Sequence, residues 1–458
     1  MTPLLLVGLG LTVVLVTLTA FRLHAFLAMI LAAFVVAVAT PGTVLEAHGL
    51  AQSKAGKMSA AQATAFGGSK PVDRVLSAFG DTCGKMGLLI AMASILGKCL
   101  LDSGSAMRIV QSVLKIFGQA RVHLGFILTG FGLAIPVYFD AVFYLLMPIG
   151  KAMARVTGKN YLLYILTIVA GATMAHSLVP PTPGPLFTAK ELGVDLRTMM
   201  IAGGIVGLFT ASTGLLWAVW ANRRWQIALP EDGPAEGVAA DHPLPSLGLA
   251  LLPIVLPIAI ISWGSFQKVP PWYSDSNVAL SIGAVLGLYV LHRHRPAGAT
   301  SVNDAVQQAI LSGAGILLIT AAGGAFGSTL RQTGVAELIQ QMGASSARNW
   351  ALPICFLVTA LVRTAQGSAT VAMITAAPIA KAFLETGALG CHPVYLALAV
   401  GCGSKPVPWF NDSGFWIITR MTGLKESETL KIVTPMMSLM GLVGLPVVML
   451  GAWLWPMV

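Results

Sequence analysis

Charged side chains are scarce in this sequence. They make up 10% of the 458 residues, whereas hydrophobic residues make up 56%. A soluble globular domain has about 25% charged residues, so the composition excludes that class. Apolar runs such as 3–21 and 161–179 approach the roughly 20 residues that a helix needs to cross the hydrocarbon core of a bilayer. The sequence therefore predicts an all-α, polytopic protein embedded in a lipid bilayer.

The sequence also lacks the patterns of a catalytic or metal site. Its five cysteines form no CxxC pair and mostly lie in apolar runs, where cysteine behaves as a small hydrophobic residue. There is no GxGD or HExxH motif, and no GxSx nucleophile paired with a base. The tract HRHR at 292–295 is typical of a basic loop that anchors a helix end. We therefore expect no metal, no cofactor and no enzymatic activity.

The chain repeats itself at an offset of 230 residues. GKCLLDSGSA at 97–106 aligns with GSTLRQTGVA at 327–336, and PIGKA at 148–152 aligns with PIAKA at 378–382. The same offset also aligns glycine, phenylalanine and threonine positions between these motifs and beyond them. This constant offset predicts two tandem transmembrane repeats, residues 1–229 and 230–458.

Each repeat is expected to hold about five spans, a re-entrant hairpin and a discontinuous helix. Hairpins are predicted at 122–156 and 350–385, because short apolar arms broken by small or polar residues need shelter from protein at membrane depth. Broken helices are predicted at 161–197 and 393–430. An odd number of crossings gives the halves opposite orientations, the inverted-repeat plan of many secondary transporters. The other spans are expected near 3–20, 23–40, 84–101, 198–221, 247–265, 277–291, 312–328 and 432–455.

The net charge of +10 predicts an orientation and no nucleic-acid partner, because the basic residues are scattered in short loops. Short loops rich in lysine and arginine face the cytoplasm. The richer side of this plan is therefore expected to be cytoplasmic, with both termini outside and the first hairpin open to the cytoplasm. The beginning, MTPLLL, has no basic region, which favours a first span over a cleaved signal peptide.

Polar side chains collect at the four predicted breaks. These are AIPVYFD (134–140), HSLVPPTPGP (176–185), RTAQGSAT (363–370) and WFNDSG (409–414). Equivalent breaks of the two halves are expected to meet at one central cavity. A charge inside hydrocarbon is costly unless it is paired or hydrated, so Asp140 and Arg363 are functional candidates. The structural alternative is a salt bridge between these two residues.

The cavity is predicted to bind a small, polyhydroxylated anion. Arg363 offers a fixed positive charge and the paired donors that a carboxylate accepts. Asn411 and Ser413 could also cap a helix, and His176 could be a satisfied core histidine. The predicted substrate-binding residues are Arg363, Gln366, Gly367, Ser368, Thr370, Asn411, Asp412, Ser413, Thr182 and His176.

At these motifs the chain resembles the gluconate permease family of proton symporters, within the broad ion transporter superfamily. The similarity runs from about residue 77 to the C-terminus, with matches at 130–159, 175–185, 360–377 and 410–416. The resemblance implies proton-coupled uptake of gluconate or a related sugar acid or hydroxy acid across the bacterial cytoplasmic membrane. It also implies a homodimer with a scaffold and a moving transport domain that contains the hairpins.

In such a symporter a carboxylate beside the cavity is expected to carry the coupling proton. The candidates are Asp140 and Asp412, with His176 a weaker one. Three other functions remain open: a sodium-coupled carboxylate transporter, a channel, and a membrane-embedded enzyme. Replacing sodium by choline discriminates the first of these from a proton symporter.

Overall fold

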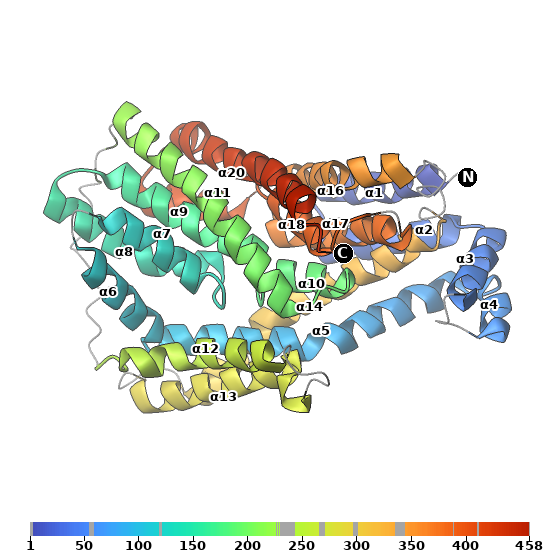
Figure 1. The fold of residues 1–458 in the computed structure, drawn as a ribbon, viewed down its shortest axis with the longest axis horizontal. Helices are drawn as coiled ribbons and strands as arrows, with labels where there is room; N and C mark the ends of the chain where they lie inside the picture. The colour runs from blue at the N-terminus through green and yellow to red at the C-terminus, as the bar shows by residue number, and fades with distance from the viewer. Residues whose placement is uncertain are drawn as a thin grey trace.

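The described part of the chain consists of helices and their connections, without a β-strand. The computed structural model describes residues 3–54, 59–118, 121–225, 227, 229, 243–264, 271–295, 301–334, 344–387, 389–409 and 412–457. In chain order (Figure 1) the elements are α1 (Pro3–Thr19), α2 (Ala25–Ala39), α3 (Gly42–Lys54), α4 (Ala60–Phe66), α5 (Pro71–Asp102), α6 (Ser105–Phe117), α7 (Val122–Leu133), α8 (Phe139–Thr157), α9 (Tyr161–Leu178), α10 (Pro183–Glu191), α11 (Leu196–Arg224), α12 (Leu247–Gly264), η1 (Trp272–Ser274), α13 (Ser276–His294), α14 (Val302–Arg331), α16 (Ala344–Gln366), α17 (Ala369–Glu385), α18 (Val394–Gly403), α19 (Ser413–Thr422) and α20 (Glu426–Leu454).

Several helices are suited to crossing a membrane. Within the described ranges, five helices or continuous helical stretches are long and apolar enough, or six if the bent pair 25–39 and 42–53 counts as one span. The protein is therefore an all-helical, multi-pass membrane protein, as the composition predicts.

The third helix of this set, α5, is longer than its apolar run. The predicted span begins at 84, whereas α5 begins at Pro71, a residue whose fixed φ suits the first helical position. Arg74 is buried near this end and donates to the carbonyl oxygen of Ala37 (2.7 Å) and to Oε1 of Gln332 (2.8 Å). These contacts hold the polar extension of α5 against its neighbours, so hydropathy alone could not locate the helix end.

The helix bounds follow the repeat offset of the sequence. The second arms of the two hairpins, α8 and α17, begin at Phe139 and Ala369. The second pieces of the broken helices, α10 and α19, begin at Pro183 and Ser413, again 230 positions apart. The breaks themselves fall between α7 and α8, α9 and α10, α16 and α17, and α18 and α19. Both halves thus interrupt their helices at equivalent residues.

The first pieces of the broken helices form the centre of the molecule. Every residue of α18 is buried, and so is every residue of α9 except His176. α9 packs against α7, α8 and α11, while α18 packs against α16, α17 and α20. In Figure 1, α12 and α13 lie beside α5 at the margin of the molecule, away from α18. The hairpins therefore surround the two broken helices.

Glycines allow α9 and α11 to approach closely. A Cβ at Gly203 of α11 would overlap the carbonyl oxygen of Leu178 in α9, whereas a Cβ at Gly204 would meet nothing within 4 Å. A backbone carbonyl in a buried helix cannot rotate away from such an overlap. We expect Gly203→Ala to lower the free energy of unfolding by about 1–3 kcal/mol through overpacking.

The neighbouring variant Gly204→Ala is the control, and should match the wild type or be slightly more stable, because alanine favours a helix by about 0.5–1 kcal/mol over glycine. Thermal unfolding of both purified proteins measures the difference. Equal midpoints for the two variants would contradict this packing of α9 against α11.

Candidate functional site

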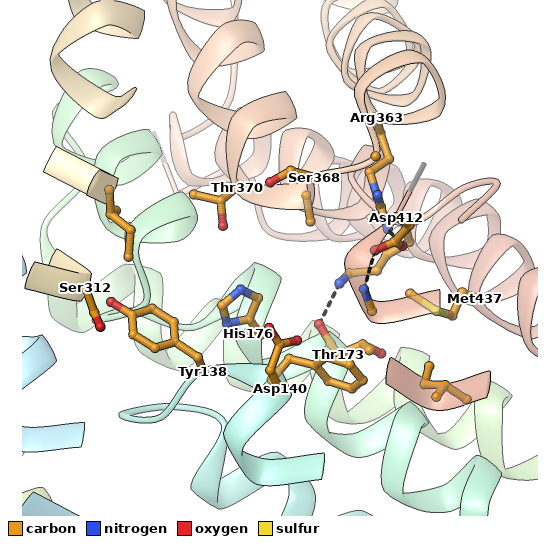
Figure 2. A pocket seen from close by; sticks show the side chains of 17 residues that line it. Tyr138, Asp140, Thr173, His176, Ser312, Arg363, Ser368, Thr370, Asp412 and Met437 are labelled. Atoms are coloured by element: carbon orange, nitrogen blue, oxygen red, sulfur yellow. Dashed lines mark hydrogen bonds and ion pairs between the residues drawn. The ribbon is translucent and has the colours of Figure 1, made fainter. Parts of the chain in front are cut away.

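The four helix breaks meet around one cavity of about 340 Å³. This volume lies at the lower end of the roughly 300–1,000 Å³ typical of small-molecule sites. α14 and α20 complete its wall. The lining residues are Tyr138, Phe139, Asp140, Thr173, His176, Ser312, Ile316, Arg363, Gly367, Ser368, Ala369, Thr370, Lys405, Asp412, Gly414, Ile418 and Met437 (Figure 2).

Three helices begin at this cavity. α8 follows Tyr138, α17 is capped by Ser368, whose Oγ accepts from the N–H of Val371 (3.3 Å), and α19 is capped by Asp412, which accepts from the N–H of Gly414 (2.8 Å). The first N–H groups of a helix have no partner within it, and the helix dipole places partial positive charge there. The cavity thus combines several backbone features that favour an anion.

Arg363 lies at the end of α16 and is 3% exposed. Its Nε donates to the carbonyl oxygen of Ser404 (3.0 Å), and its Nη2 donates to the carboxylate of Asp412. Nη1 is buried and has no hydrogen-bond partner in the described part of the chain. The alternative of a salt bridge with Asp140 is wrong, because the irregular segment between α18 and α19 brings Asp412 to the guanidinium instead.

Lys405 is a second buried cation, which the sequence analysis missed. Its side chain is 2% exposed, and Nζ donates to the carbonyl oxygen of Thr173 in α9 (2.6 Å). The signal was present in the sequence, because Lys405 follows the apolar run of α18 and an intramembrane charge is a functional candidate by the argument applied to Arg363. The bond joins the two broken helices across the cavity.

Asp140 lies in the first turn of α8 and lines the same cavity. Its carboxylate forms no hydrogen bond or ion pair with any residue for which the structure gives a position. Asp412, in contrast, has both a guanidinium and a backbone N–H as partners. The two carboxylates therefore differ in how well their negative charge is satisfied.

One side of the cavity carries hydroxyl groups instead of charges. Figure 2 shows Ser312 and Tyr138 on the side opposite Arg363 and Asp412, with His176 between them. The Tyr138 hydroxyl is 3.2 Å from the hydroxyl of Ser94, and the His176 and Tyr138 rings meet edge to face. Nδ1 of His176 is buried without a partner among the described residues.

The structure brings most of the predicted site residues together. Gln366 and Thr182 do not line the cavity: Gln366 accepts from the N–H of Ser368 (2.7 Å), and the Thr182 hydroxyl donates to carbonyl oxygens at the end of α9. Asn411 lies outside the described residues, and Ser413 is the first residue of α19. The predicted residues that do line the cavity are Asp140, His176, Arg363, Gly367, Ser368, Thr370 and Asp412.

A multi-pass helical protein with a charged cavity where its helices are interrupted is a membrane transport protein in class. The pattern described as GntP family permease matches residues 57–454. The chain therefore belongs to the GntP family of permeases and is not an enzyme.

The chain is similar to characterised transporters over most of its length. It is 31% identical to the gluconate permease of Pseudomonas aeruginosa over 401 residues, covering 83% of this chain and 88% of the relative. It is 26% identical to the Gnt-II system L-idonate transporter of Escherichia coli K12 over 460 residues, covering 97% of each. The crystal structure of the YdaH transporter of Alcanivorax borkumensis shares the fold, with a TM-score of 0.62 at 14% identity over 84% of this chain and 90% of that one.

The two buried cations Arg74 and Lys405 should differ in their effect on stability. Arg74→Met leaves the carbonyl of Ala37 and the amide of Gln332 without their donor, which costs about 1–3 kcal/mol. Lys405→Met leaves Asp412 paired with Arg363, and replacing a buried charge by an apolar residue of similar volume is often neutral or stabilising by about 1–4 kcal/mol. Thermal unfolding compares them. An equal loss of stability in both variants would assign Lys405 a structural role.

Proposed function

We propose that this permease takes up gluconate or a related sugar acid, together with protons, across the bacterial cytoplasmic membrane. The observation that carries the proposal is the charge content of the central cavity. Two cations, Arg363 and Lys405, and two carboxylates, Asp140 and Asp412, line one buried space. Its composition relates the binding of an anion to the binding of a proton.

The four charges cancel when both carboxylates are ionised. An additional anion would then be uncompensated, which is costly at membrane depth. If Asp140 binds a proton, the lining has one excess positive charge, and a monocarboxylate neutralises it. Asp140 is the better proton carrier of the two carboxylates, because Asp412 already has a cation and an N–H group as partners. Proton and anion are therefore bound together.

The shape of the cavity favours a hydroxylated acid in one orientation. The carboxylate would lie near Arg363, whose Nη1 is unpartnered in the described part of the structure, and near the first N–H groups of α17. The hydroxyl groups of the substrate would extend toward Tyr138 and Ser312. Relatives that carry gluconate and L-idonate support this substrate class.

Alternating access follows from the way the breaks are packed. The hairpin arms α7, α8, α16 and α17 pack against the buried helices α9 and α18, so hairpins and broken helices can move as one body. We propose that this body moves between the two sides of the membrane while the remaining helices stay fixed, and that two copies of the chain form a homodimer.

Uptake of labelled sugar acids into proteoliposomes tests the proposal directly. The wild-type protein should accumulate gluconate when the outside is acidic, and accumulation should persist when sodium is replaced by choline. Asp140→Asn should abolish accumulation and retain exchange of internal for external gluconate, because the permanently neutral side chain mimics the protonated form.

Asp412→Asn is the control, because it removes a partner of Arg363 and should reduce both accumulation and exchange. Accumulation by Asp140→Asn at the wild-type level would exclude Asp140 as the proton carrier. Loss of wild-type uptake in choline would favour the sodium-coupled alternative.

Arg363→Lys should weaken gluconate binding by about 1–3 kcal/mol, which corresponds to roughly 5- to 150-fold, because lysine keeps the charge and loses the paired N–H donors. Binding of a neutral polyol such as sorbitol should change little. Calorimetry with both ligands measures the difference. Unchanged gluconate binding would remove Arg363 from the substrate site and leave the carboxylate to the helix N-termini.

A further inference from the structure

A second polar cavity, of about 140 Å³, lies between α5, α10, α14 and α17. It shares no lining residue with the central cavity. Helices from both halves of the chain form its wall. Its ionisable lining residues are Asp81, Lys85, Lys190, Glu191, Arg331 and Lys381, so four cations face two carboxylates.

Glu191 serves two of these cations with one oxygen. Oε1 accepts from the guanidinium of Arg331 and lies 3.4 Å from Nζ of Lys381. The three side chains are 15%, 20% and 28% exposed, respectively, so this cluster is partly sheltered from solvent. A single carboxylate leaves an excess positive charge on the pair of cations. An anion that enters the cavity would neutralise this excess.

Two helices connect this cavity with the central one. α17 begins at the central cavity and carries Lys381 twelve positions later, which is about 18 Å at 1.5 Å per residue. α10 begins beside α17, where the position of a Cβ on Gly184 is 3.6 Å from Cα of Thr370, and ends at Glu191. Arg331 belongs to α14, which packs against both α5 and α17. A ligand at the second cavity would therefore act on the helices that shape the first.

We propose that the second cavity is a binding site for a small carboxylate, which competes with Glu191 for Arg331 and Lys381. The site concentrates anions near the path to the central cavity, and its occupation breaks the ion pair that joins α10 to α14. Only the identity of the ligand as a permeant acid rests on the proposed function. The anionic headgroup of a lipid shares part of this chemistry, so the test includes phosphate.

The experiment uses the full-length purified protein carrying Arg363→Ala, which weakens carboxylate binding at the central cavity. Gluconate binding to this protein is measured by calorimetry. Adding Glu191→Gln removes the competing carboxylate and should strengthen the residual gluconate binding by about tenfold, the value of one charge-assisted contact. Adding Arg331→Gln or Lys381→Gln instead should abolish it, and the two variants secure the test if one of them fails to fold.

Lys151→Gln is the matched control. Lys151 lies on α8 at the position of the first half that corresponds to Lys381, and it does not line the second cavity. Its removal should leave residual binding unchanged. A gain with Glu191→Gln and a loss with Arg331→Gln support the site. Equal binding in all variants, or displacement of gluconate by an equal concentration of inorganic phosphate, overturns it in favour of a nonselective or headgroup site.

The central and second sites fail independently in this design. Comparison of the wild type with Arg363→Ala reports on the central cavity and therefore on the proposed function. Comparison of Glu191→Gln with Arg331→Gln, both in the Arg363→Ala protein, reports on the second cavity alone.

Discussion

The contact of Arg363 with Asp412 and the Ser404 carbonyl is the constraint on which the central cavity depends. A guanidinium at membrane depth requires acceptors, and a continuous helix has no free carbonyl groups to offer along its length. The interruption between α18 and α19 supplies both acceptors. The helix break is thus the condition for burying the charge, and the same break leaves the N-terminus of α19 open to the cavity.

The sequence was sufficient for the helices and for the location of the site. The apolar runs predicted the helical membrane protein, and the matched motifs predicted the permease family, which the comparison confirms. The offset of 230 residues predicted equivalent breaks, and the helices do begin at equivalent residues. Asp140 and Arg363 were identified because charge is rare in such a chain. The opposite orientation of the two halves stays a prediction.

The partners of each charge could not be predicted from the sequence. Asp140 and Asp412 are both polar residues at a break, and only the path of the chain after Ser404 decides that Asp412 reaches the guanidinium. Gln366 and Thr182 have the same chemistry as substrate ligands, yet their side chains are used by nearby backbone groups. Lys405 was missed because the motifs around it, and not each isolated charge, were taken as the signal.

The repeat of the backbone is not a repeat of the charge. At the offset of 230 residues, Arg363 corresponds to Leu133 and Lys405 to Ala175, both buried and apolar. The two halves share one helical plan, and the second half alone holds the cations of the central cavity. A molecule held there has a fixed head and tail with respect to the chain. Inward and outward transport are consequently not mirror images in energy, and the carrier has an intrinsic direction in its kinetics.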